Sequence, residues 1–294
     1  MTHAPLDFAY FQKLTSLIKK ENNLLFEGLW DCPKALISIA SLQKLNKNIL
    51  IISGSERETK LLDDLNFFYS SPILSFPAWE TIPGEGIIPS YDIVGRRFSI
   101  LNTLAKAKTN YIVITSVQGI MQKLISPKVL EKNQITLTNK MRISFESLKT
   151  NLASIGYSQV AVAADKGEYA VRGGIIDIFP SSAPNPYRID FFDDDIEQIR
   201  SFDPISQKSI GKVDSCFISP AREHTLLEKN TCSHTLLDYF KTPPIVIFDD
   251  LLSIEDRCVS LKSLPSSMHM LSFAQVMDKT SCTKRLFIAN QPVE

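Results

Sequence analysis

Residues 168–202 read EYAVRGGIIDIFPSSAPNPYRIDFFDDDIEQIRSF, and this stretch has the pattern of antiparallel strands joined by short turns. Apolar and polar residues alternate in EYAVR, IIDIF, YRIDFF and IEQIRSF, which is the two-residue period of a strand with one buried face. Gly173-Gly174 and Asp193–Asp195 provide turn residues between runs, the three aspartates as a solvated hairpin turn. The stretch therefore predicts a small antiparallel sheet.

One helix and a further strand precede this sheet in the sequence. Phe145, Leu148, Leu152 and Ile155 recur at helical spacing, with Ser144 as an N-cap and a closing glycine after Ile155. The run QVAVA (159–163) then predicts another strand. Together these elements predict a small α+β antiparallel domain.

The flanking sequence has a different pattern, in which continuous apolar runs alternate with helices. The runs are ILIIS (49–53), PILSFP (72–77), YIVITS (111–116) and IVIFD (245–249), and an amphipathic helix opens the chain at residues 6–20. This alternation is typical of a parallel sheet covered by helices. We therefore expect an α/β domain, residues 1–126 and 223–294, interrupted by the α+β domain at 127–222. Residues after about 263 have no clear pattern.

The composition argues against several classes of protein. The 294 residues are 44% hydrophobic and 22% charged, and 32 basic residues balance 32 acidic ones. That balance gives no positive field for strong non-specific DNA binding. Five scattered cysteines without a CxxC pair, and four histidines without ligand spacing, predict neither a disulfide framework nor a metal site. With no signal peptide or long apolar run, we expect a soluble cytoplasmic protein without membrane contact.

Residues 28–35 (GLWDCPKA) resemble a degraded phosphate-binding loop. Such a loop needs glycines whose backbone N–H groups wrap the phosphates, a lysine, and a hydroxyl for magnesium. Gly28 and Lys34 have the right spacing, but Pro33 replaces the second glycine and Ala35 replaces the hydroxyl residue. An ordinary loop that enters a helix is the simpler interpretation.

The apolar strand IVIFDD (245–250) ends in two carboxylates, Asp249 and Asp250. Paired aspartates at such a position hold magnesium in NTPases, but they also end many strands as solvated turn or N-cap residues. Two leucines follow the pair, where a working enzyme would have a polar residue.

The strand YRIDFF (187–192) offers a candidate binding surface. Alternation places Tyr187, Ile189 and Phe191 on one face and Arg188, Asp190 and Phe192 on the other. If the first face is the core, Phe192 is exposed beside Arg188, and aromatic and arginine side chains dominate binding hot spots. The alternative is that Phe192 lies under a loop and Arg188 pairs with Asp190.

Several motifs together resemble the N-terminal region of bacterial transcription-repair coupling factor (Mfd), which is itself similar to the excision-repair helicase UvrB. They are FPAWETIP (76–83), DIVGRR (92–97), TSVQGIMQK (115–123), GEYAVRGG (167–174) with IIDIFP, and PYRIDFFDD (186–194). The resemblance covers about residues 20–257. It implies a degenerate P-loop, RecA-like helicase domain interrupted by the small domain.

In UvrB-like proteins the loop at 28–35 is a working phosphate loop, and the strand before Asp249 ends in a magnesium-binding acidic pair. The resemblance therefore implies that Gly28, Lys34, Asp249 and Asp250 are remnants of a nucleotide site. The segment between Pro89 and Arg96 has no room for the DNA-threading hairpin of UvrB, and the second helicase domain is absent. We expect no ATPase activity and no cofactor for this chain. ATP, magnesium, RNA polymerase and DNA belong to segments of the full-length family protein outside it.

In the family the small domain binds UvrA, the damage-recognition ATPase. The matching positions are Arg172, Arg188 and Phe192, and strand alternation independently exposes two of them. The resemblance implies a module that brings UvrA to lesions where RNA polymerase has stalled, either a fragment or a truncated paralogue. The alternatives are a weak nucleotide-binding P-loop NTPase domain that uses Lys34, Asp249 and Asp250, and a DNA-binding module.

Overall fold

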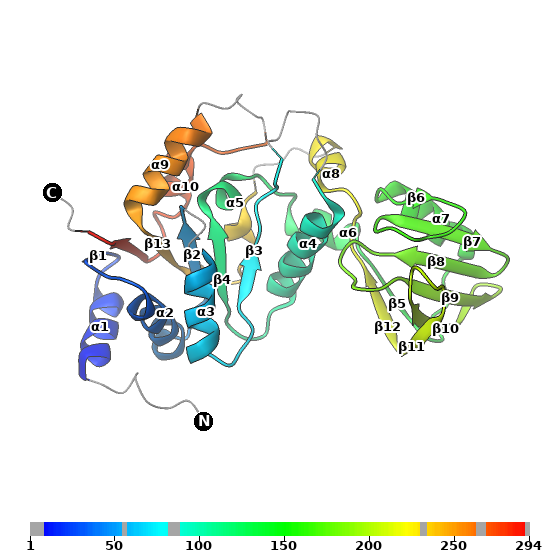
Figure 1. Ribbon diagram of the computed structural model, residues 1–294, viewed down its shortest axis with the longest axis horizontal. Helices are drawn as coiled ribbons and strands as arrows, with labels where there is room; N and C mark the ends of the chain where they lie inside the picture. Colours follow the sequence, from blue (N-terminus) through cyan, green and yellow to red (C-terminus); the bar gives the residue numbers. More distant parts are fainter. Residues whose placement is uncertain (1–8, 55–57, 82–88, 230–233, 263–268, 292–294) are drawn as a thin grey trace.

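The chain contains a large α/β part and a smaller antiparallel part, which lie at opposite ends of the molecule (Figure 1). In the computed structural model, the described residues are 9–54, 58–81, 89–229, 234–262 and 269–291. The start of the opening helix at 6–8 and the end of the FPAWETIP motif lie outside them.

The large part is built on a six-stranded sheet in which all neighbouring strands are parallel. In sheet order the strands are β1 (Asn23–Glu27), β14 (Arg285–Ala289), β13 (Ile245–Asp249), β2 (Ile49–Ser53), β4 (Ile112–Ser116) and β3 (Leu74–Phe76). β2, β4 and β13 match the predicted apolar runs. They are continuous runs because helices cover both faces of the sheet.

Alternate residues of β2 enter different cores: Ile49 and Ile51 face one layer of helices, and Leu50 and Ile52 face the other. The first layer is formed by α1 (Ala9–Lys20), α2 (Cys32–Leu45) and α3 (Glu58–Phe68). The second contains α4 (Tyr91–Lys106), α5 (Val117–Met121), α6 (Pro127–Lys132), α8 (Glu223–Lys229), η2 (Leu236–Tyr239), α9 (Leu251–Lys262) and α10 (Phe273–Lys279). No helix among the described residues is long and apolar enough to span a membrane.

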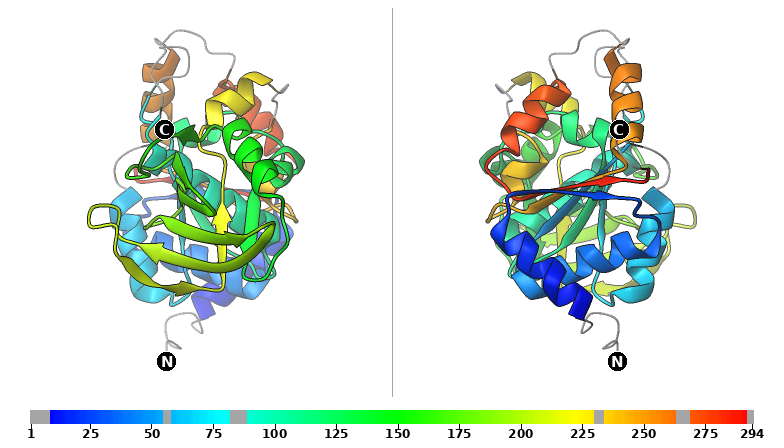
Figure 2. Two further views of the ribbon diagram at one scale, coloured as in Figure 1. Left: turned by 90° about the vertical axis from the view of Figure 1, so that its right-hand side faces the viewer. Right: turned by 90° about the vertical axis from the view of Figure 1, so that its left-hand side faces the viewer.

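The tail of the chain has a structure that the sequence pattern did not predict. β14 lies between β1 and β13 and is parallel to both, as the right-hand view of Figure 2 shows for β1 and β14. The sheet of the α/β part therefore includes residues from both ends of the chain, and the predicted α/β architecture is confirmed with two more strands.

The smaller part contains a six-stranded sheet and a two-stranded ribbon. The sheet order is β11 (Ser209–Val213), β10 (Asp195–Phe202), β9 (Tyr187–Phe192), β8 (Ile175–Phe179), β7 (Glu168–Arg172) and β6 (Ser158–Gln159). β5 (Ile135–Thr138) and β12 (Ser215–Ile218) form the ribbon, and α7 (Phe145–Ser154) is the helix. These segments lie between β4 and β13 in the sequence, as expected, while the boundaries at 126 and 222 stay predictions.

The predicted helix and its cap are confirmed, since the Ser144 hydroxyl accepts a hydrogen bond from the Ser147 N–H. The prediction of a strand over 159–163 is wrong beyond Gln159, and β6 is parallel to β7. The chain turns away here because backbone groups find other partners. The Ala161 carbonyl accepts from Arg172, and the Ala164 N–H donates to Glu168 Oε2.

A buried ion pair between α4 and α8 lies where the chain returns from the small part to the α/β part. The fully buried Arg97 guanidinium donates to both Glu223 oxygens, at 2.7 and 3.1 Å, and lies over the rings of Phe76 and Trp79. The Trp79 indole N–H donates to the same carboxylate at 2.8 Å. Glu223 begins α8, directly after the chain leaves the small part. The network therefore fixes the exit of the small part to the α/β core.

Two contacts hold the same helix against the small part. Asp92 pairs with Lys166 at 2.6 Å on the surface. Gly95 packs so closely on the Ser181 carbonyl that an added Cβ would lie 2.0 Å from its oxygen. The small part therefore meets a defined face of α4.

Candidate functional site

The predicted nucleotide residues gather at the carboxyl ends of β2 and β13, except Gly28, which lies earlier in the loop before α2. Lys34 Nζ contacts Asp249 Oδ1 at 2.6 Å, and both side chains are almost completely buried. Asp250 has a left-handed backbone, and its Oδ2 accepts from the Asn290 amide at 2.7 Å. The lysine that a phosphate would need thus already has an internal carboxylate partner.

The space beside this ion pair is small, about 40 Å³, with Trp30, Asp31 and Lys60 at its rim. Sites for small molecules usually enclose roughly 300–1,000 Å³, whereas one water occupies about 30 Å³ of liquid. Pro33 also removes one N–H from the first turn of α2. The geometry suits one or two waters better than a nucleotide.

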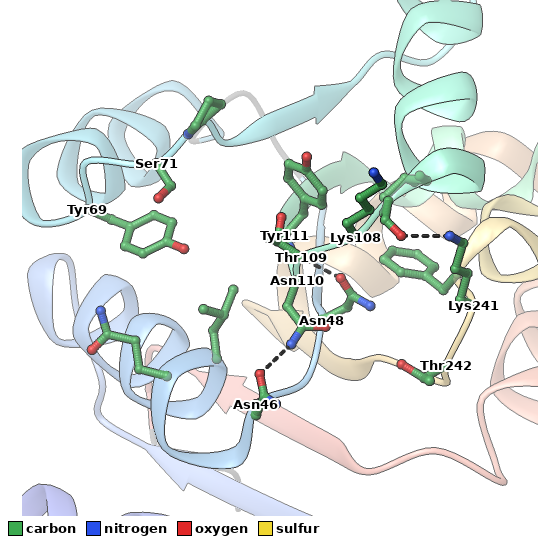
Figure 3. A pocket seen from close by; sticks show the side chains of 16 residues that line it. Asn46, Asn48, Tyr69, Ser71, Lys108, Thr109, Asn110, Tyr111, Lys241 and Thr242 are labelled. Atoms are coloured by element: carbon green, nitrogen blue, oxygen red, sulfur yellow. Dashed lines mark hydrogen bonds between the residues drawn. The ribbon is translucent and has the colours of Figure 1, made fainter.

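A larger hollow of about 690 Å³ lies at the opposite edge of the sheet, where β2 and β4 begin (Figure 3). Its polar groups are bonded to one another: Asn110 donates to Asn46, the Tyr111 N–H donates to Asn48, and Lys241 donates to the Ala107 carbonyl. Ligands of parallel α/β sheets bind outside the carboxyl ends of the strands. The hollow is on the other side, and no pattern in the sequence had indicated it.

The small part contains the second candidate site, on the face of its sheet that points away from its core. Arg172 is opposite Ile175 on β8, and Ile175 is opposite Asp190 on β9. Residues opposite each other share a face, and so do residues two apart on a strand. Arg188 and Phe192 flank Asp190 at that spacing, so all three predicted residues lie on one face, which we call the outer face.

The other face is the core. Ile189 is completely buried, and Tyr187 and Phe191 pack against the same cluster. The Phe191 ring also meets Phe145 of α7 edge-on, with ring centroids 5.2 Å apart. The predicted assignment of the two faces of this strand is therefore confirmed.

The prediction that the Arg188 side chain is exposed is wrong. Its Nε and Nη2 donate to the two oxygens of Asp177, each at 2.7 Å, and its guanidinium lies 4.6 Å from the Phe202 ring centroid. Only 17% of the Arg188 side chain and 3% of the Asp177 side chain are accessible. The hydrogen bonds with Asp177 raise the pKa of Arg188 above its ordinary value. Its partner is also not Asp190, which pairs with Arg200.

Phe192 is 68% exposed, so it does not lie under a loop. It ends β9 close to the β7–β8 turn, where the Phe191 N–H donates to the Gly174 carbonyl at 2.8 Å. Arg172 is exposed and begins that turn, and its guanidinium donates to the Ala161 carbonyl at 3.1 Å. An exposed aromatic ring and an arginine thus lie near one turn of the outer face.

The predicted turn at Asp193–Asp195 joins β9 to β10, and Asp193 has a left-handed φ of 53°. It is not simply solvated, because Asp194 Oδ1 accepts from the Phe145 N–H at 3.0 Å and the Asp194 carbonyl accepts from the Ile143 N–H. These bonds attach the turn to the start of α7. Among the described residues, no group of three histidine, cysteine or acidic side chains is arranged to hold a metal ion.

Comparison with known proteins concerns this same part of the chain. A family described as "UvrB interaction domain" matches residues 135–224, which include all three residues of the outer-face site. This segment is therefore similar to that family.

A larger part of the chain is similar to transcription-repair-coupling factors, as its motifs predicted. It is 31% identical to that of Haemophilus influenzae over 73% of the chain and 19% of the relative. The corresponding values are 33%, 60% and 15% for Escherichia coli, and 30%, 68% and 17% for Bacillus subtilis. The chain thus spans less than a fifth of the length of these relatives.

Proposed function

We propose that this chain is a UvrA-recruiting module that contributes to the coupling of transcription with DNA repair. The family match supports the partner, and the relatives' name supports the pathway. The observation that favours the outer face as the contact surface is the exposed Phe192, which lies beside the β7–β8 turn that Arg172 begins. Contacts with RNA polymerase and DNA would belong to other segments of a longer protein.

Within this surface the three predicted residues would act differently. Phe192 would fill an apolar recess of UvrA, and Arg172 would pair with a carboxylate there. Arg188 would contribute the exposed edge of its guanidinium, while Asp177 holds the group in place. Arginine's planar fork suits this double role better than a lysine ammonium.

The test is UvrA binding, measured by surface plasmon resonance, together with thermal melting. We expect Phe192→Ala to weaken binding by about 30- to 1,000-fold, typical for a central anchor. Because the side chain is exposed, its loss should change stability by only about 0.5 kcal/mol. Ile189→Ala, on the core face, should instead cost about 2–5 kcal/mol of stability.

Phe67→Ala is the matched control, since Phe67 is an exposed phenylalanine on α3 of the α/β part. It should leave both UvrA affinity and melting unchanged. If Phe192→Ala binds UvrA as the unmodified chain does, the outer face is not the contact surface.

We also propose that the chain has no ATPase activity. The Lys34–Asp249 pair and the small space beside it support this, because the phosphate position is filled by the protein's own charges. The nucleotide-binding alternative has no comparable observation in its favour.

A further inference from the structure

The turn between β10 and β11 presents an apolar side chain to solvent. Ile205 at this turn is 93% exposed, the highest value among the large hydrophobic residues that the structure describes. Single exposed apolar residues are common on proteins and by themselves indicate no function. Whether Ile205 can act as a binding residue depends on whether this turn has a fixed conformation and on what lies beside it.

The turn is held by a set of short hydrogen bonds. Asp203 Oδ1 accepts from the N–H and the hydroxyl of Ser206, at 2.7 and 2.8 Å. The Gln207 N–H donates to the Asp203 carbonyl, and the Asp203 N–H donates to the Lys208 carbonyl, both at 2.9 Å. A side chain on such a turn loses little conformational freedom when a partner covers it.

The same turn is attached to the outer face. Gln207 Oε1 accepts a hydrogen bond from Arg188 Nη2 at 3.3 Å, and Arg188 lies over Phe202, the last residue of β10. Ile205 is thus two residues from a direct partner of the proposed UvrA site. The turn and the site belong to one surface.

The strands set the size of that surface. Phe192 is opposite Asp195, the first residue of β10, and the turn follows Phe202 at the other end of this eight-residue strand. At about 3.3 Å per residue, the two ends are roughly 25 Å apart. A standard interface buries about 800 Å² on each partner, an area about 30 Å across. One partner can therefore cover both ends.

We propose that Ile205 is a second apolar anchor of the UvrA contact surface, at the opposite end from Phe192. This inference rests on the proposed function. Between the anchors lie the Asp177–Arg188 and Asp190–Arg200 pairs, whose charges are neutralised within the sheet. The partner surface is then one with two apolar recesses about 25 Å apart and little net charge between them.

The experiment compares Ile205→Ser and Phe192→Ala in UvrA binding, with the whole chain and melting measured in parallel. Ile205→Ser should weaken binding by about 10- to 100-fold without a change in melting temperature. Ile205→Leu, which keeps the apolar side chain, should retain most of the affinity. Leu252→Ser, at an exposed leucine on α9, is the matched control and should bind normally.

The outcomes separate the two proposals. If Phe192→Ala loses affinity while Ile205→Ser does not, the second anchor is wrong and the proposed function stands. If neither variant loses affinity, the outer face is not the contact surface and the second anchor is wrong with it. If the unmodified chain does not bind UvrA, the proposed function itself fails. A loss for Ile205→Ser that Ile205→Leu shares would also overturn the proposal, because apolar burial could not explain it.

Discussion

Replacing Glu223 with glutamine should destabilise the chain more than any surface charge change. The substitution keeps the size of the side chain but leaves the Arg97 guanidinium buried without its counter-charge. It also places an amide N–H₂ among donors, at a position where the Trp79 indole and Arg97 now donate at 2.7–3.1 Å. Loss of one partner of a buried pair costs about 3–5 kcal/mol.

For a protein of this size, 1 kcal/mol corresponds to roughly 2–4 °C, so the melting temperature should fall by about 6–20 °C. The assay is urea unfolding followed by circular dichroism, together with thermal melting. Asp92→Asn is the control, because the Asp92–Lys166 pair joins α4 to the small part but Asp92 is 75% exposed. It should cost at most about 1 kcal/mol.

A double variant without either charge provides a second test of the buried ion pair. Arg97→Met with Glu223→Leu removes both charges, so it should recover much of the stability that Glu223→Gln loses. If Glu223→Gln is no more destabilising than Asp92→Asn, the buried pair does not fix α8 to α4 as described.

Three further predictions concern individual side chains. Titration with ATP and magnesium should give no saturable binding. ATP turnover that Lys34→Ala abolishes would contradict the proposal that the chain has no ATPase activity. Burial lowers the pKa of His224 below its ordinary value, so the neutral imidazole is favoured in the folded chain. Stability should therefore be full above about pH 6.5 and decrease as the pH falls below it, a dependence that His224→Gln should remove in melting curves. Burial raises the pKa of Cys216 to about 12, so a thiol reagent at pH 8 should modify the exposed Cys282 in the native chain but Cys216 only after denaturation.

The central strands and the faces of β9 could be predicted because local periodicity determines them. Ile49–Ser53 is apolar throughout since both faces are covered, and Tyr187–Phe192 alternates since one face is. The partner of Arg188 could not be predicted, because Asp177 comes opposite it only through the register of two strands. Likewise, the sequence of Arg285–Ala289 contains nothing that places it between β1 and β13.

The proposed UvrA contact surface shows the same division. Exposure of Phe192 follows from alternation, since Ile189 on the opposite face of the strand is buried. Ile205 was not identified, because its importance depends on a turn that Asp203 and Gln207 fold back toward Arg188. Such hydrogen bonds join residues whose relation is invisible in periodicity.

The position of β14 has a consequence for how the sheet is completed on the ribosome. β1 is synthesised more than 250 residues before β14, its hydrogen-bonding neighbour. Until Arg285–Ala289 emerges, the backbone groups of β1 and one side of β13 have no strand to pair with. Unpaired edges of this kind invite pairing with other chains. A truncation before Arg285 would therefore leave β1 and one side of β13 without their neighbouring strand, and both would be prone to pair with other chains.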